Sequence, residues 1–191
     1  MDKTSIGNKP YLYPYPVVLI GAEVDGKPNF MTIAFCGIVN MNPGMIAFGA
    51  SRNHYTNKGI IKNQTFSVNI PTQEMLEIVD YVGIYSGNAT DKSGLFNVFY
   101  GQLKNAPLIN DCPINMECKV LKIINLGGVD DIFIGEIIET YANPDYLKDG
   151  LPDIEKIKPL LFSMFDNRYF SIGNAIGQGW SDGKNYIKSN S

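Results

Sequence analysis

Residues 16–51 read PVVLIGAEV-DGKP-NFMTIAFCGIVN-MNPG-MIAFGAS, so three apolar runs are separated by two short polar sequences. Each run is rich in β-branched and aromatic residues, which favour strands. The separators contain the Asp-Gly and Asn-Pro-Gly combinations that are typical of turns. We therefore predict strands at 16–24, 29–40 and 45–51. The small residues Gly49, Ala50 and Ser51 end the third strand, and they fit either a ligand close to the backbone or a crowded barrel corner equally well.

The rest of the chain continues this β-rich pattern with little helix. Thr56 and Thr72 are suitable N-caps for two short helices, and Met75, Ile78, Val79 and Val82 recur at helical spacing in the second. Further strands are predicted at 65–70, 114–126, 131–142 and 160–165, with a polar excursion at 143–158 that holds at most a short helix. Many strands without regular strand–helix alternation indicate a mainly β barrel or sandwich with a few short helices.

Composition excludes several classes of function. Sixteen basic and nineteen acidic residues give a net charge of −3, which argues against general nucleic-acid binding. No apolar run approaches the roughly 20 residues needed to cross a bilayer, so no membrane span is expected. The polar start and three unpatterned cysteines indicate a cytoplasmic protein with reduced thiols. We expect one domain over 1–191, with a core at about 12–175 and a loose tail at 176–191.

The usual catalytic motifs are missing from the sequence. His54 is the only histidine, neither zinc-ligand spacing nor a G-x-S-x-G elbow occurs, and the glycine-rich stretch at 173–179 has the wrong order for a dinucleotide fingerprint. We therefore expect no metal site and no catalytic side chain. Demanding chemistry would have to come from a bound cofactor.

A set of short motifs in fixed order resembles the flavin reductase-like domain, and within it the flavoredoxin type. They are Asp25-Gly26-Lys27-Pro28-Asn29, Met31-Thr32-Ile33-Ala34, Ser51, Tyr55-Thr56, Phe66 to Pro71, Ser86-Gly87 with Asp91-Lys92, Glu117 to Val120, Phe133 to Ile137 and Tyr169 to Gly173. The resemblance implies a Greek-key split β-barrel that binds FMN and forms a homodimer.

The same resemblance assigns the cofactor contacts. It implies that the isoalloxazine lies along Asn29, Met31, Thr32, Ile33 and Ala34. It implies that the ribityl and phosphate groups lie along Ser51, Arg52, His54, Tyr55 and Thr56, with Lys92 at the phosphate. Arginine, lysine, a hydroxyl and helix N-terminal amides are the donors that a phosphate needs. Arg52 and Lys92 alone also fit ordinary surface charges, His54 fits a solvated loop residue, and Cys36 fits a small core residue.

Three functions are compatible with this interpretation. The first is an FMN-dependent oxidoreductase that takes electrons from NAD(P)H. The second is an electron carrier that exchanges electrons with a redox protein, for which the alternating Tyr11, Tyr13 and Tyr15 form either a docking surface or an edge strand. The third is a split barrel that binds a cofactor without catalysis.

Overall fold

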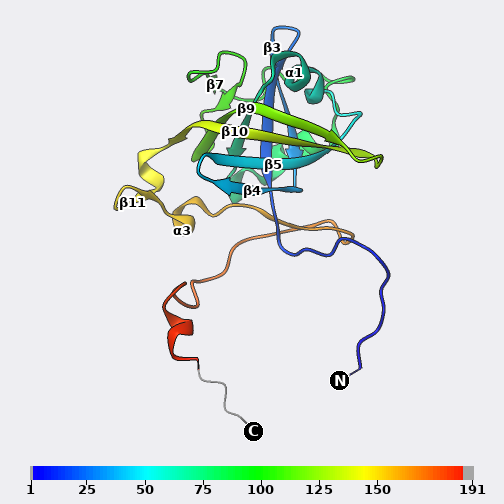
Figure 1. The fold of residues 1–191 in the computed structure, drawn as a ribbon. Helices are drawn as coiled ribbons and strands as arrows, with labels where there is room; N and C mark the ends of the chain where they lie inside the picture. Colours follow the sequence, from blue (N-terminus) through cyan, green and yellow to red (C-terminus); the bar gives the residue numbers. More distant parts are fainter. Residues whose placement is uncertain (1, 187–191) are drawn as a thin grey trace.

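An antiparallel sheet of seven strands dominates the computed structural model, which describes residues 2–186 (Figure 1). Its strands pair in the order β3-β2-β6-β9-β10-β5-β4. In chain order they are β2 (Val18–Val24), β3 (Lys27–Ile33), β4 (Cys36–Met41), β5 (Gly44–Ser51), β6 (Thr65–Ile70), β9 (Ile114–Asn125) and β10 (Asp130–Ala142). The mainly β split-barrel prediction is therefore confirmed, as are the strands predicted at 45–51, 65–70, 114–126 and 131–142.

The sheet has an apolar layer on each face because its central strands alternate buried residues between two cores. On β2, Val18 and Ile20 point into the first cluster, while Leu19 joins the second. The first cluster centres on Phe48, whose ring stacks on Phe133 at 5.0 Å and meets Phe66 edge-on at 5.2 Å. Side chains that point in opposite directions along one strand explain why 16–24 is apolar throughout.

The run at 29–40, predicted as one strand, is broken into β3 and β4. The chain bends at Ala34 and Phe35, where the Cys36 amide donates to the Ala34 carbonyl at 3.1 Å. The Gly49 amide donates to the Phe35 carbonyl at 2.9 Å. The bend is needed because β3 and β4 occupy the two opposite ends of the pairing order. A strand propensity that runs unbroken through the segment could not reveal this change of direction.

Two helices follow, α1 (Thr56–Asn63) and α2 (Leu76–Ile84), the second preceded by the 3-10 turn η1 (Gln73–Met75). The stripe on α2 is confirmed, since Val79 and Val82 are buried in the second cluster and Met75 and Ile78 pack against it. The predicted caps are wrong. Thr56 is the first helical residue and makes no capping bond, and Thr72 precedes η1 without one.

The remaining elements are short. They are β1 (Tyr15–Pro16), β7 (Val98–Phe99), β8 (Leu108–Ile109), η2 (Pro144–Tyr146), β11 (Leu147–Lys148), β12 (Leu151–Pro152), α3 (Ile154–Ile157), β13 (Leu161–Ser163), β14 (Arg168–Phe170) and η3 (Asp182–Asn185). The strand predicted at 160–165 is β13, which ends at Ser163, and β14 was not predicted. In a small second sheet, β13 lies between β1 and β14 and pairs with both. The excursion at 143–158 has the predicted short helix.

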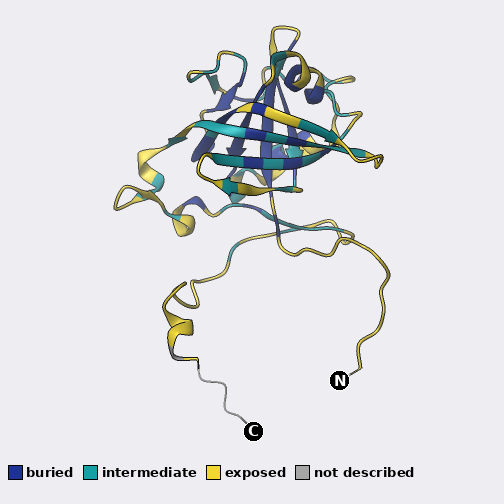
Figure 2. Cartoon of the chain, in the orientation of Figure 1, coloured by how far each residue is buried: buried dark blue, intermediate teal, exposed yellow. Residues whose placement is uncertain are grey.

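Both ends of the chain leave the barrel on the same side, as Figures 1 and 2 show. Of the three alternating tyrosines only Tyr15 is in a strand and buried, so the edge-strand interpretation fails for Tyr11 and Tyr13. At the other end, the described part of the predicted tail is exposed and carries η3. The tail's last part, 187–191, lies outside the described residues.

Candidate functional site

Three neighbouring cavities follow the end of β3 and the start of α1. Their volumes are about 470, 370 and 270 Å³. The first and second share Tyr55 and Lys92, and the first and third share Thr32 and His54. Each cavity is near the lower end of the size range of small-molecule sites. The shared walls make them parts of one elongated hollow.

The sequence-predicted site residues gather around this hollow. Met31, Thr56, Tyr55, Lys92, Thr32 and His54 line the first cavity, Asn29 lines the second, and Ile33, Ala34 and Ser51 line the third. The small residues Gly49 and Ala50 also line the third cavity, and a Cβ at Gly49 would meet only the Phe35 side chain, at 3.7 Å. Of the two interpretations of these small residues, the geometry therefore favours access to the backbone over a crowded corner.

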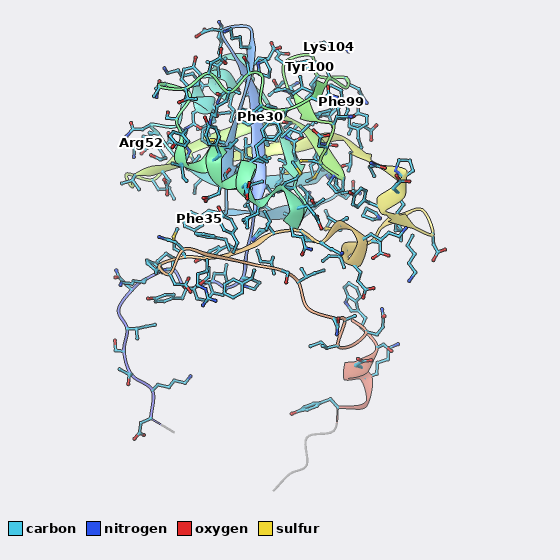
Figure 3. All side chains as sticks on the ribbon, turned by 180° about the vertical axis from the view of Figure 1, so that it is seen from behind. Phe30, Phe35, Arg52, Phe99, Tyr100 and Lys104 are labelled. Carbon is cyan, nitrogen blue, oxygen red and sulfur yellow. The ribbon has the colours of Figure 1, made fainter. Side chains whose placement is uncertain are left out.

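Arg52 is the one predicted residue that lines none of the three cavities. Its Nε donates to the Asp131 carboxylate at 3.2 Å, and its guanidinium also donates to the Gly128 carbonyl. Figure 3 shows Arg52 on the side of the β9–β10 hairpin. These bonds direct the guanidinium to the hairpin, so the structure does not bring Arg52 together with Lys92.

Lys92 is a buried cation at the junction of the first two cavities. Only 3% of the residue is exposed, and its Nζ donates to the carbonyls of Phe30 at 2.6 Å and of Val82 at 3.2 Å. Burial lowers its pKa to about 8. Within residues 2–186 it has no carboxylate partner, because the adjacent Asp91 pairs with Lys27 at 2.8 Å instead. An ammonium has three hydrogens, so one remains for a ligand in the cavity.

Asn29 and Thr56 form the wall between the first and second cavities. The Asn29 side-chain amide donates to the Thr56 hydroxyl at 2.7 Å, which ties β3 to the first turn of α1. Gly87 lies against this pair: a Cβ there would overlap the Tyr55 ring and come within 2.7 Å of the Asn29 Oδ1. The Lys58 Nζ lies 4.6 Å from the centre of the Tyr55 ring and donates to Asn88 at 3.1 Å. The wall is thus tightly packed and well hydrogen-bonded.

His54 is half-buried between the first and third cavities. Its Nδ1 is buried and has no partner within the described residues. Burial lowers the pKa of His54, Asp130 raises it and Lys92 lowers it further. The balance favours the neutral imidazole, whose Nδ1 is an unsatisfied polar atom. Such an atom costs free energy unless a ligand or water meets it.

Several lining residues were absent from the predicted set. Ser86, Gly87 and Asn88 line the first cavity, and the Ser86-Gly87 motif could have identified the first two. Phe35, which is labelled in Figure 3, lines the third cavity, and so do Met164 and Asp130. Nothing in the local sequence indicates the last two. Asp130 arrives only because β10 pairs with β5 and places it opposite Ser51.

Other kinds of site are not evident in residues 2–186. No group of three or more His, Cys, Asp or Glu side chains is arranged to hold a metal ion. None of the helices described there has the length and apolarity to cross a bilayer. Cys36 packs against the first cluster as the predicted small core residue, and burial raises the pKa of its thiol to about 12.

The arrangement fits a planar ligand that carries an anion. A buried cation without a carboxylate partner among the described residues, together with free amide donors at the start of a helix, suits the anion. Backbone groups that are accessible beside small residues suit a flat ring. Flavin mononucleotide has both features, so the residues present fit this cofactor.

Comparisons with known proteins identify the family and the fold of the chain. A family model described as the flavin reductase like domain matches residues 11–173. The structure is similar to a flavoredoxin from Methanosarcina acetivorans, with 44% identity, a TM-score of 0.94 and coverage of 96% of this chain and 98% of that one. It is also similar to a flavoredoxin from Desulfovibrio vulgaris (Miyazaki F), with 33% identity, a TM-score of 0.88 and coverage of 96% and 100%.

A more distant likeness extends to the fold alone. An FMN-binding protein from Thermus thermophilus shares 20% identity at a TM-score of 0.79, with coverage of 93% of this chain and 99% of that one. The family model alone covers most of the chain. This chain therefore belongs to the flavin reductase-like family and carries a domain of the flavoredoxin type.

Proposed function

We propose that this protein is an FMN-dependent oxidoreductase that receives electrons from NAD(P)H or from a redox protein. Family membership supports a flavin-binding redox function, and the finer assignment depends on the hollow described above. The observation that carries it is Lys92, a buried cation with no acidic partner among the described residues, at the junction of two cavities.

The phosphate of FMN would be held where Lys92 approaches the first turn of α1. The backbone amides of Tyr55 and Thr56 make no hydrogen bond within residues 2–186, so both are available as donors. Together with the third hydrogen of Lys92 they form a set of donors for a doubly charged group. The favourable end of the helix dipole adds to the attraction.

The isoalloxazine would be held along Thr32, Ile33 and Ala34, opposite the small residues Gly49 and Ala50. The bound flavin supplies the redox chemistry, because it accepts and releases electrons. The chain contributes orientation and electrostatics: His54 offers a buried ring nitrogen, and the bond from Asn29 to Thr56 fixes the wall of the hollow. Assignment of the chemistry to the cofactor agrees with the absence of catalytic motifs in the sequence.

The decisive experiment has two steps. The purified protein is denatured, and any released cofactor is identified by mass spectrometry; FMN is expected. The holoprotein is then mixed without oxygen with NADH, NADPH or a reduced ferredoxin-type protein, and bleaching of the flavin absorbance is followed. Bleaching by a nicotinamide identifies an NAD(P)H-dependent enzyme, and bleaching by the protein donor alone identifies a carrier. A protein that is isolated colourless and fails to bind added FMN would contradict the proposal.

A further inference from the structure

A fourth cavity, of about 350 Å³, adjoins the hollow in which the flavin is proposed to bind. It shares Thr32 and Ala34 with the third cavity, and it shares Thr32, Gly83 and Ile84 with the first. Its volume is at the lower end of the range for small-molecule sites. A molecule in this cavity would therefore lie beside the strand that is proposed to hold the isoalloxazine.

The walls of the fourth cavity are mostly apolar and come from distant parts of the chain. Val17 precedes β2, Ile84 ends α2, and Phe162 lies on β13. Tyr169 on β14 is paired with Phe162 across the small sheet, and the two rings lie 5.2 Å apart. The β13–β14 hairpin belongs to the orange stretch that runs past the lower end of the barrel in Figure 1. Aliphatic and aromatic walls of this kind suit a flat ring.

The polar end of the cavity is a hydrogen-bonded pair, Asp80 on α2 and Tyr169 on β14. The Tyr169 hydroxyl donates to the Asp80 Oδ1 at 2.9 Å. Burial raises the pKa of Tyr169, and the bond to Asp80 raises it further, so the phenol keeps its proton. Among the described residues, Asp80 has neither a basic partner nor a donor to its Oδ2. This second oxygen is therefore available to accept a hydrogen bond from a ligand.

The fourth cavity and the neighbouring hollow have opposite electrostatic character. Asp80 is the only charged side chain among the described residues that line the fourth cavity. Its other polar side chains, Thr32 and Asn167, are uncharged, and the Thr32 hydroxyl already donates to the Val79 carbonyl at 2.6 Å. The hollow, in contrast, contains the buried ammonium of Lys92. A phosphate or carboxylate is therefore attracted to the hollow and repelled from the fourth cavity.

We propose that the fourth cavity binds a second small molecule beside the flavin, and that Asp80, held in place by Tyr169, determines its charge. The ligand is a flat ring with a cationic or uncharged hydrogen-bond donor, such as an amidine, an amine or a primary amide. Rings that carry a carboxylate or a phosphate are excluded. The position beside the flavin rests on the proposed function, whereas the selection by charge depends only on the residues of the cavity.

Three probes of nearly the same shape test this selection: benzamidine, benzamide and benzoate. At neutral pH they are a cation, a neutral molecule and an anion. Calorimetry on the purified holoprotein should show that benzamidine binds at least about tenfold more tightly than benzoate, the scale of one hydrogen bond to a charged group. Benzamide should fall between them, and none of the three should displace FMN.

Two sources of ligand share this chemistry, a free aromatic amide or amine and the nicotinamide ring of NAD(P)H with its carboxamide. Competition separates them. If the nicotinamide ring enters the fourth cavity, benzamidine should slow the bleaching of the flavin by NADH in proportion to its occupancy. If a free small molecule is the ligand, benzamidine should bind and leave this bleaching unchanged.

Matched variants on one helix test the role of Asp80. Asp80→Asn should bring the three affinities to within about threefold of one another, because it removes the charge that separates the probes and keeps the shape of the side chain. Glu77→Gln is the control, since Glu77 is an exposed residue of α2 that lines none of the four cavities. It removes the same charge and should keep the preference for the cation, and so should Tyr169→Phe, which retains the Asp80 carboxylate.

The location of the probe is measured in the wild type, so the test remains decisive if Asp80→Asn fails to fold. Nuclear Overhauser effects from benzamidine should reach the ring protons of Phe162, which lines the fourth cavity and none of the other three. The proposal would be overturned by benzoate binding as tightly as benzamidine, by displacement of FMN, by no effect at Phe162, or by equal losses in Asp80→Asn and Glu77→Gln. A protein that binds FMN but none of the probes would contradict this inference and leave the proposed function intact. Calorimetry needs no flavin, so charge-selective binding to a protein without FMN would contradict only the proposed function.

Discussion

The side-chain amide of Asn29 donates to the hydroxyl of Thr56 at 2.7 Å, and both residues are almost fully buried. This single bond joins the middle of β3 to the first residue of α1. It therefore sets the spacing between the two elements that line the hollow. Sequence motifs had indicated both residues as cofactor contacts, and the structure shows that they also hold each other in place.

Thr56→Val should destabilise the protein. Valine matches the shape of threonine but cannot accept a hydrogen bond, so the buried Asn29 amide would lose its partner at a cost of about 1–3 kcal/mol. The free energy of unfolding from urea titration measures this effect. Thr56→Ser keeps the hydroxyl and should retain most of the stability; an equal loss in both variants would show that the bond contributes little.

Lys92→Met should weaken FMN binding by about 1.5–3 kcal/mol, or about 10- to 150-fold, because it removes a charge-assisted bond to the phosphate. Riboflavin lacks the phosphate, so its affinity should change little. Arg52→Ala is the matched comparison, since Arg52 was also predicted at the phosphate but is bonded to Asp131 and Gly128. If Arg52→Ala weakens FMN binding and Lys92→Met does not, the phosphate lies beside the β9–β10 hairpin instead.

FMN affinity should fall as the pH rises above about 8. The pKa of Lys92 is about 8 in the folded chain, so its ammonium loses a proton in this range. The expected loss approaches tenfold per pH unit above the pKa. Fluorescence titrations with FMN and riboflavin over this range measure the effect, and only FMN should respond. A flat FMN profile would place the phosphate away from Lys92.

The same pKa has a consequence for the stability of the flavin-free protein. Because the folded value of about 8 lies below the ordinary 10.5, the folded chain binds fewer protons than the unfolded chain between these two values. The contribution of Lys92 to the free energy of unfolding should therefore increase with pH across this window. Urea titrations of the wild type and of Lys92→Met, each carried out near pH 8 and near pH 10.5, isolate the contribution of Lys92 to the free energy of unfolding.

His54 should titrate below its ordinary pKa of 6.5, because burial disfavours the imidazolium. It is the only histidine of the chain, so NMR gives a single, unambiguous titration curve. The unfolded chain binds the proton more readily, and the contribution of His54 to stability should accordingly decline as the pH falls through 6.5. A measured pKa at or above 6.5 would mean that Asp130 outweighs burial.

Gly87→Ala should disturb the wall of the hollow. The new methyl group would overlap the Tyr55 ring and approach the Asn29 Oδ1, a case of overpacking that costs about 1–3 kcal/mol. Both the free energy of unfolding and FMN affinity should decrease. Gly94→Ala is the control, because a Cβ at Gly94 meets nothing within 4 Å. If both variants lose equal stability and FMN affinity, the cause is the change of backbone freedom at a glycine and not a disturbed wall.

Much of the fold could be predicted because local chemistry specifies it. Turn residues and β-branched runs located most strands, and the spacing of Val79 and Val82 located the buried face of α2. The break at Ala34 and Phe35 could not be predicted, because it serves strand pairing across the whole sheet. The caps failed for a related reason: the Thr56 hydroxyl bonds to Asn29, 27 residues away, in place of its own helix.

The candidate site could likewise be predicted only in part from the sequence. Ordered motifs identified residues on consecutive stretches of chain, such as Thr32, His54 and Lys92. They could not indicate that Arg52 would turn to Asp131, because that ion pair depends on the pairing of β5 with β10. Asp130 and Met164 reach the third cavity through long-range contacts as well. Properties that depend on three-dimensional neighbours, such as the lowered pKa of Lys92, have no local sequence signal.

The order of strands in the sheet also has a consequence for synthesis of the protein. Every residue that lines the first two cavities lies between Val24 and Lys92. The strands that hold this half of the sheet together, β9 and β10, begin only at Ile114 and pair with β6 and β5. A nascent chain thus exposes all of these groups to solvent before the strands that arrange them have left the ribosome. Cofactor capture should consequently be a late, post-translational event, despite the early position of its ligands in the sequence.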